Sequence, residues 1–193
     1  MEDQETIPWM HLPRLVVFDL DYTLWYPYID VLHGGPFTKT NDPTKVLDCR
    51  GHPLTLFPHV ETILNLVKTK PQFQETQVAI ASRTGEIAAA KECLKLLQVV
   101  ITTEKSTRCT PLHELVDFVE IFPSCKLDHF RRLHRQSGIP YQEMLFFDDE
   151  ERNIHDVQTL GVTCEYCPNG LSTTSWRHGL AAFQVSKNVA PRS

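Results

Sequence analysis

The sequence predicts an α/β protein built on a doubly wound, mostly parallel sheet of the Rossmann-like class. Short apolar runs of strand length alternate along the chain with longer stretches in which apolar residues recur at helical spacing. Residues 15–20 are apolar at every position except Asp19, which is typical of a central strand buried on both faces. Because strands separated by helices pair in parallel, this alternation favours a parallel sheet with helices on both faces.

The elements expected after this first strand come in the same alternating order. Gly138 is expected to end the helix over 126–137, because glycine readily adopts the left-handed conformation that closes a helix. The chain from residue 185 onward is expected to be frayed. Helices are predicted over 58–70, 86–98, 126–137, 152–160 and 172–183, and the further strands over 77–82, 144–147 and 162–166.

Two segments depart from this pattern. Residues 25–57 are rich in proline, glycine, threonine and aspartate, which predicts an extended loop or hairpin that forms a small flap rather than a large cap domain. Residues 99–121 have mixed character, with a short helix predicted after Pro111. That link is either a partner-binding excursion or a neutral insertion, and the low cost of surface insertions favours the second. We expect a single domain over 1–193, with its core over about 12–183.

Composition narrows the class of protein. A length of 193 residues suits one domain, and the net charge of −5 gives no indication of a nucleic-acid or membrane surface. Residues 1–6 are acidic and no apolar run is long enough for a bilayer, so we expect a cytoplasmic chain in a reducing compartment, without a signal peptide. The six scattered cysteines do not suggest a disulfide framework. For Cys164 and Cys167, a C-x-x-C pair, two small buried residues are favoured over a zinc or redox site.

Polar residues follow several of the apolar strands directly. In a doubly wound sheet, ligands bind beyond the carboxyl ends of the strands, so these residues should meet at one edge. Each residue alone could instead cap a helix or form a turn. That explanation is weaker for the whole set, because it does not explain why polar groups follow apolar strands directly and always at the ligand-binding end. The residues are Asp19, Asp21, Ser82, Arg83, Thr84, Asp148 and Asp149, and Lys126 opens a helix nearby.

The clustered carboxylates would repel one another and any phosphate group, and a divalent cation would resolve that conflict. Carboxylate oxygens, a carbonyl and waters suit Mg²⁺. Asp19 and Asp21 are separated by one residue, so in an extended chain both side chains could point the same way. One could then bind the metal and attack, while the other reaches the leaving group. Lys126 and the backbone N–H groups after Ser82 could neutralise phosphate oxygens.

At this point the motifs resemble the haloacid dehalogenase superfamily of phosphatases. The matching strings are Asp19-Leu-Asp21-Tyr-Thr23, Ala-Ser82-Arg-Thr, Lys126, and Phe-Phe-Asp148-Asp-Glu. The longer strings Phe-Asp-Leu-Asp-Tyr-Thr-Leu-Trp, Ala-Ser-Arg-Thr and Phe-Phe-Asp-Asp-Glu-x-Arg-Asn-Ile are most similar to the eukaryotic magnesium-dependent phosphatase family. The resemblance covers residues 12–183 and implies the haloacid dehalogenase type of fold without a large cap.

The resemblance also implies a role for each motif. Asp19 would be the nucleophile that forms an aspartyl-phosphate, and Asp21 the acid and base. Lys126 would stabilise both the nucleophile and the transferred group, and Ser82 and Arg83 would bind the substrate. Mg²⁺ would be the cofactor. Its ligands would be Asp19, Asp21 through its backbone carbonyl, and Asp148 and Asp149, which remain alternatives as the direct ligand.

An open site suits a phosphorylated protein side chain as substrate, but it also admits small sugar phosphates. Trp25, Tyr26 and Tyr28 could line its entrance, or could pack as core instead. Two alternatives to hydrolysis stay open, namely a phosphotransferase such as a mutase, and a non-catalytic module that binds a phosphorylated partner. The sequence identifies neither the physiological substrate nor the oligomeric state.

Overall fold

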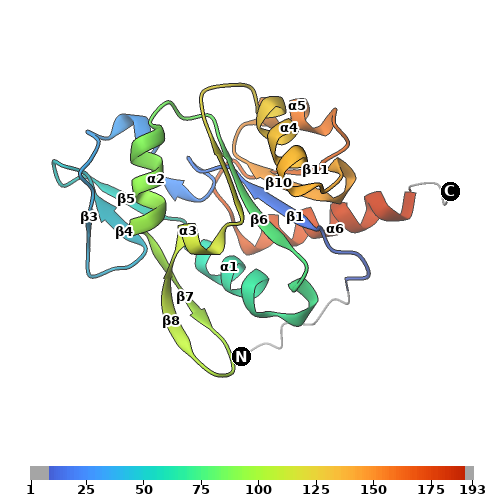
Figure 1. The fold of residues 1–193 in the computed structure, drawn as a ribbon, viewed down its shortest axis with the longest axis horizontal. Coiled ribbons are helices and arrows are strands. Elements are labelled where there is room, and N and C mark those ends of the chain that lie inside the picture. The colour runs from blue at the N-terminus through green and yellow to red at the C-terminus, as the bar shows by residue number, and fades with distance from the viewer. Residues whose placement is uncertain (1–8, 190–193) are drawn as a thin grey trace.

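A five-stranded parallel sheet forms the centre of the computed structural model, which describes residues 9–189 (Figure 1). The strand order is β11-β10-β1-β6-β9, and every neighbouring pair is parallel. This confirms the predicted fold class. The acidic residues 1–6 and the final residues 190–193 of the predicted domain lie outside the described part of the chain. The strands are β1 (Leu15–Phe18), β6 (Gln77–Ser82), β9 (Phe118–Ile121), β10 (Met144–Asp148) and β11 (Thr163–Tyr166).

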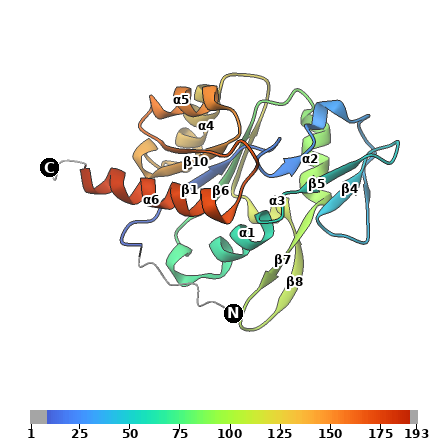
Figure 2. The same ribbon diagram turned by 180° about the vertical axis from the view of Figure 1, so that it is seen from behind.

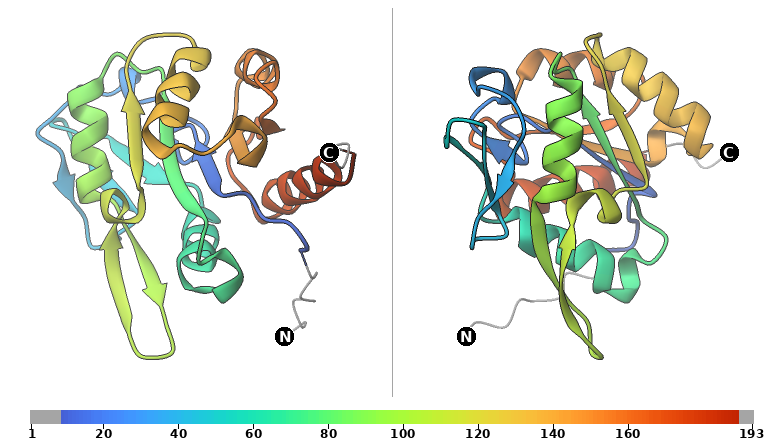
Figure 3. Two further views of the ribbon diagram at one scale, coloured as in Figure 1. Left: turned by 45° about the vertical axis from the view of Figure 1, so that its right-hand side comes forward. Right: turned by 60° about the vertical axis from the view of Figure 1, so that its left-hand side comes forward.

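Helices cover both faces of this sheet, as Figures 2 and 3 show. Side chains alternate along β1, so that Leu15 and Val17 pack with α4 and α5, whereas Val16 and Phe18 pack with α1, α2 and α6. A strand buried on both faces explains the continuous apolar run in the sequence. The helices are α1 (Val60–Thr69), α2 (Ile87–Leu96), α3 (Leu112–Leu115), α4 (Lys126–Ser137), α5 (Glu151–Gln158) and α6 (Thr173–Val189), with short 3₁₀ turns η1 (Ile29–Val31), η2 (Pro71–Phe73) and η3 (Tyr141–Glu143).

The element boundaries follow the prediction closely, with two informative differences. Gly138 adopts φ +67° and its N–H bonds the carbonyl of His134, which confirms its role in ending α4. The first strand ends at Phe18, because the Leu20 carbonyl then accepts the N–H groups of the next turn. The expected fraying from residue 185 was wrong over 185–189, where α6 continues and Lys187 pairs with Glu143.

The flap, residues 25–57, is more ordered than the loop or hairpin that we expected. It forms a four-stranded antiparallel sheet in the order β2-β5-β4-β3 (Figure 1). The side chains of Val46 on β4 and Leu54 on β5 are fully buried. Its strands are too short to show a clear alternation in the sequence, which is why only the flap itself was predicted. They are β2 (Trp25–Tyr26), β3 (Thr38–Lys39), β4 (Lys45–Leu47) and β5 (Pro53–Leu56).

The second irregular segment contains a hairpin of β7 (Gln98–Thr102) and β8 (Thr107–Pro111), which extends away from the central sheet (Figure 3). Side chains of α1 bind the outer edge of β7, since Glu61 accepts the N–H of Val100 and Asn65 that of Thr102. The short helix predicted after Pro111 is confirmed as α3. The hairpin and β9 were not predicted.

All six cysteines are free, as the absence of a disulfide pattern suggested. Cys164 lies within β11 and is half-buried, and Cys167 directly follows the strand and is buried, so only Cys167 matches the expectation of two small buried residues. Over residues 9–189, no helix is both long and apolar enough to span a bilayer.

Candidate functional site

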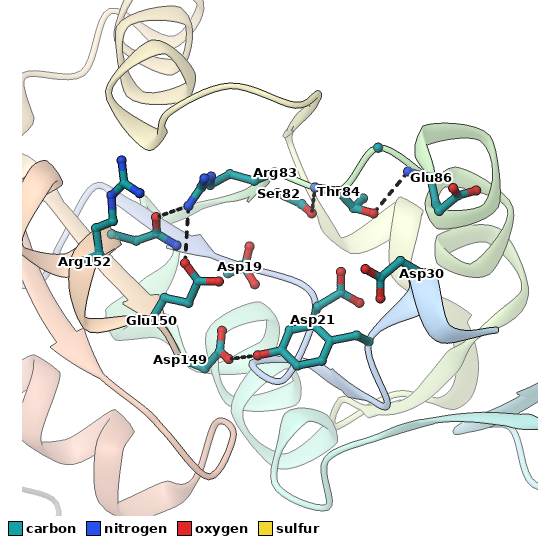
Figure 4. Close-up of a pocket in the computed structure, with 13 residues that line it drawn as sticks. Asp19, Asp21, Asp30, Ser82, Arg83, Thr84, Glu86, Asp149, Glu150 and Arg152 are labelled. Carbon is teal, nitrogen blue, oxygen red and sulfur yellow. Dashed lines mark hydrogen bonds and ion pairs between the residues drawn. The ribbon is translucent and has the colours of Figure 1, made fainter.

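The carboxyl ends of β1, β6 and β10 open into one pocket of about 590 Å³ (Figure 4). These strands are direct neighbours in parallel register, so the residues that end them meet at the same edge of the sheet. The pocket is strongly acidic. Its lining residues are Asp19, Asp21, Tyr28, Asp30, Ser82, Arg83, Thr84, Gly85, Glu86, Asp149, Glu150, Arg152 and Asn153.

Lys126 binds two of the carboxylates at the base of this pocket. Its Nζ lies 2.5 Å from Oδ1 of Asp19 and 2.9 Å from Oδ2 of Asp148, and it also donates to the carbonyl of Ala81. Burial lowers the pKa of Lys126, but the two carboxylates more than offset this and raise it, so the ammonium remains charged. The first residue of α4 therefore joins β1, β6 and β10.

Burial also affects the two aspartates that follow β1. It raises the pKa of Asp19, and the nearby ammonium of Lys126 opposes that effect. Burial likewise raises the pKa of Asp21, although Oδ1 of Asp21 accepts hydrogen bonds from Nε1 of Trp25 at 2.7 Å and from the N–H of Ile29 at 2.8 Å. Asp21 is therefore held by the flap, whereas Asp19 is held by α4.

Asp148 and Asp149 have different surroundings although they are adjacent. Asp148 is fully buried, and its Oδ1 accepts a hydrogen bond from the backbone N–H of Glu150 at 2.8 Å. Nδ2 of the Asn153 side chain lies 3.0 Å from Oδ1 and 3.1 Å from Oδ2 of Asp148 and donates to this carboxylate. Asp149 lines the pocket and accepts the hydroxyl of Tyr28 at 2.8 Å. Burial raises the pKa of Asp149 to about 6. The structure therefore brings both of these predicted residues to the site, one beneath the pocket and one in its wall.

The segment after β6 forms the opposite wall (Figure 4). Ser82 is buried, and its Oγ accepts the N–H of Thr84 at 3.3 Å. Arg83 reaches across the pocket, where Nη1 lies 3.0 Å from Oδ1 of Asn153 and 3.3 Å from Oε2 of Glu150. The guanidinium thus connects the loop after β6 to the start of α5.

Oxygen donors dominate the site, and this donor chemistry fits a magnesium ion. Asp19, Asp148 and Asp149 lie around one edge of the sheet, and of these Asp19 and Asp148 share the ammonium of Lys126. Two carboxylates on one buried ammonium, with Asp149 beside them, favour a hard divalent cation with oxygen ligands, which would balance their negative charge.

The aromatic residues divide between the two roles that the sequence left open, and one site residue was missed. Tyr28 lines the pocket, whereas Trp25 is fully buried in the core and Tyr26 packs on Phe57 outside the pocket. Asn153 was not assigned a role, although it lies within the matched string after Asp148. The position of Asn153 inside that string, in the first turn of α5, was the signal that could have identified it.

The chain is similar in sequence to several known proteins. Residues 11–186 match the Acid Phosphatase family. Magnesium-dependent phosphatase 1 of Homo sapiens is 40% identical over 182 residues, covering 94% of this chain and 93% of that protein. A HAD-like hydrolase superfamily protein of Schizosaccharomyces pombe is 39% identical over 155 residues, covering 80% of this chain and 85% of the relative.

The fold is also similar to that of solved structures. One is the N-terminal part of a Bacteroides fragilis protein containing a phosphatase domain, complexed with Mg, with a TM-score of 0.56 and 18% identity. That likeness covers 90% of this chain and 40% of the other, and at this identity it supports the fold alone. The sequence matches, which are much stronger, show that the chain belongs to the acid phosphatase family, among the magnesium-dependent phosphatases of the haloacid dehalogenase superfamily.

Proposed function

We propose that this chain is a magnesium-dependent phosphatase that hydrolyses phosphomonoesters through an aspartyl-phosphate on Asp19. The observation that carries the proposal is the contact of one buried ammonium, Lys126 Nζ, with Asp19 and Asp148 at the base of an open pocket. An anionic nucleophile needs such a cation when it approaches an anionic phosphate group. The family membership of the chain supports the same activity.

The first half of the reaction forms the covalent intermediate. Lys126 holds Oδ1 of Asp19, so Oδ2 is the oxygen that attacks phosphorus. A bond forms between Oδ2 and phosphorus while the bond from phosphorus to the leaving oxygen breaks. Asp21 gives its proton to that leaving oxygen, and its raised pKa favours the protonated form that this step requires.

The second half releases phosphate. Asp21, now ionised, takes a proton from a water molecule that attacks phosphorus, and the bond between phosphorus and Asp19 breaks. Inorganic phosphate leaves and Asp21 is protonated again. Ser82 and the N–H groups that follow it lie on the opposite wall, where they can donate to phosphate oxygens in both halves.

Magnesium would be held by carboxylate oxygens of Asp19, Asp148 and Asp149, together with the backbone carbonyl of Asp21. When bound, it would supply positive charge to the phosphate oxygens. Asn153 and Glu150 support this set, because their N–H groups fix the carboxylate of Asp148. The human relative at 40% identity is named for its dependence on magnesium, which supports the same cofactor here.

The substrate class rests on the shape of the pocket. The small flap leaves the pocket open to solvent. Tyr28 lines the pocket, and its ring stacks on that of Tyr22 with centroids 4.6 Å apart. Such a site admits a phosphorylated tyrosine side chain of a protein, and its polar lining also suits a sugar phosphate.

The decisive experiment measures phosphate release and the covalent intermediate together. Purified protein is assayed on phosphotyrosine peptides and sugar phosphates with Mg²⁺ or with a chelator, and acid-quenched samples are examined for a phosphorylated protein. We expect Mg²⁺-dependent hydrolysis and an acid-stable adduct, both lost in Asp19→Asn. The control Glu104→Gln removes one carboxylate charge from the distant β7–β8 turn and should behave as wild type.

Each other result has a clear meaning. Activity that survives both the chelator and Asp19→Asn would contradict the proposed mechanism. Folded wild-type protein that binds these compounds without hydrolysing any of them would favour a binding module. Transfer of the phosphoryl group to an added sugar faster than to water would favour a phosphotransferase.

A further inference from the structure

A second cluster of potential metal ligands lies in the flap, outside the phosphatase pocket. The ligand atoms of His33, Asp48 and His52 all lie within 4.8 Å of one another. His33 belongs to the loop that follows η1, and the other two belong to the turn between β4 and β5. None of the three lines the phosphatase pocket. We propose that these three residues form a binding site for a divalent transition metal ion, with Zn²⁺ as the representative ligand.

The distances are compatible with a shared metal ion. Nδ1 of His52 lies 3.3 Å from Oδ2 of Asp48, a long hydrogen bond in the metal-free structure. A strong hydrogen bond between charged groups would be shorter, at roughly 2.7–2.9 Å. Two ligands of a tetrahedral zinc ion, at roughly 2.0–2.2 Å from the metal, are separated by about 3.3 Å. The distance between Nδ1 of His52 and Oδ2 of Asp48 therefore already matches that of two ligands on one metal ion. The ligand atom of the exposed His33 ring lies within 4.8 Å of the other two.

Asp48 is preorganised for such a role. Its side chain is buried, and its carboxylate accepts the N–H groups of His33 at 2.9 Å, Arg50 at 2.9 Å and His52 at 2.8 Å. These bonds fix the direction of the ligand in the way that outer hydrogen bonds orient metal ligands elsewhere. The backbone bonds alone would explain Asp48 as a turn residue. They do not require two imidazole rings beside it, with centroids 5.0 Å apart.

The ligand types distinguish this site from the phosphatase pocket. Two imidazoles and one carboxylate suit zinc, nickel or copper, whereas the all-oxygen pocket suits magnesium. Both histidines are exposed, which leaves the fourth position open to water. The thiol of Cys49 donates to the carbonyl of His33 at 3.3 Å and is not one of the three ligands. A bound metal would therefore connect the loop after η1 to the β4–β5 turn.

The experiment titrates the full chain with Zn²⁺ in the presence of excess Mg²⁺, which occupies the phosphatase pocket. Calorimetry gives stoichiometry and affinity, and thermal unfolding gives an independent measure. We expect one zinc ion per chain and a rise in Tm. The double variant His33→Ala/His52→Ala should bind zinc about tenfold more weakly or worse and lose the rise in Tm.

Matched controls separate this site from other thiols and histidines. Cys49→Ser and His155→Ala, which removes an exposed imidazole on α5, should bind zinc as wild type does. Asp19→Asn should also retain the site. Wild-type affinity in the double variant, or loss of binding in any of these three controls, would overturn the proposal. Because both rings are exposed, the double variant should keep the wild-type Tm in chelator, and His33→Gln/His52→Gln repeats the test with less change of volume.

Discussion

Trp25 and Asp21 are joined by a 2.7 Å hydrogen bond from the indole Nε1 to Oδ1 of the carboxyl group. The N–H of Ile29 donates to the same oxygen at 2.8 Å. Both donors belong to the flap, and Trp25 is fully buried where β2 pairs with β5. Packing thus fixes one oxygen of the proposed acid, so that Oδ2 is the oxygen left to exchange a proton with the substrate.

Replacing Trp25 by phenylalanine should affect substrates unequally. Trp25→Phe removes the N–H but keeps an aromatic ring, so Asp21 becomes less well oriented. We expect kcat/KM, which reports formation of the aspartyl-phosphate, to fall by about ten- to a hundredfold for alkyl phosphates, whose leaving groups need a proton, and much less for 4-nitrophenyl phosphate. Steady-state kinetics on both esters checks this. An equal fall for both would indicate a purely structural role, and Trp176→Phe, a buried indole in the core, is the control.

Removing the charge of Lys126 should destabilise the metal-free protein strongly. Lys126→Met leaves Asp19 and Asp148 without their buried partner, which should lower the free energy of unfolding by about 3–5 kcal/mol in chelator. Mg²⁺ should restore part of that stability, since it supplies charge to the same carboxylates. Urea unfolding with and without Mg²⁺ measures both. Lys187→Met breaks the more exposed pair with Glu143, so it should lower the free energy of unfolding by less, and Mg²⁺ should not restore that loss.

Asn153 should affect Mg²⁺ binding by orienting the carboxylate of Asp148. Asn153→Ala removes the amide that donates to both carboxylate oxygens, so Asp148 loses its orientation. We expect the Mg²⁺ concentration for half-maximal activity to rise by about ten- to a hundredfold. A titration of activity against Mg²⁺ gives that value. The control Gln158→Ala changes an exposed amide at the end of the same helix, and an equal shift in both variants would argue against the specific role.

The stability contributed by Asp48 should depend on pH. Burial raises the pKa of Asp48, but the N–H groups of His33, His52 and Arg50 more than offset this and hold it well below its usual range. Because the folded-state pKa lies below the unfolded value of about 3.9, the ionised carboxylate stabilises the folded protein at pH values above about 3.9. That stabilisation is lost as the pH falls towards the folded-state pKa. In chelator, the Tm difference between wild type and Asp48→Asn should be constant near neutrality and narrow below about pH 4. A difference that widens with acid would contradict this.

Much of the fold could be predicted because the central strands are buried on both faces and therefore read as continuous apolar runs. The same reasoning predicted that Asp19, Ser82 and Asp148 would meet, since parallel neighbours end at one edge. β9 was missed because Glu120 interrupts its apolar pattern. Its buried carboxylate is balanced by Gln136 and Arg132 of α4, a tertiary contact that local sequence does not reveal.

The site residues that escaped prediction are those whose role depends on contacts across the fold. From the sequence, Trp25 could line the entrance or pack in the core, and only the pairing of β2 with β5 shows that it is buried against Asp21. Asn153 lies in a matched string, but its two bonds to Asp148 depend on where α5 begins. The flap sheet was also unpredictable in detail, because β2 and β3 contain two residues each.

The two aspartates of the first motif have separate supports, and this separation has a kinetic consequence. Asp19 is anchored by α4, more than a hundred positions away in the chain, whereas Asp21 is anchored by its own neighbours in the flap. Local opening of the flap would leave the transfer of a phosphoryl group from activated esters to Asp19 intact. It would impair only the hydrolysis of the resulting aspartyl-phosphate. A chain damaged in this segment would therefore become a stalled, phosphate-loaded protein instead of an inert one.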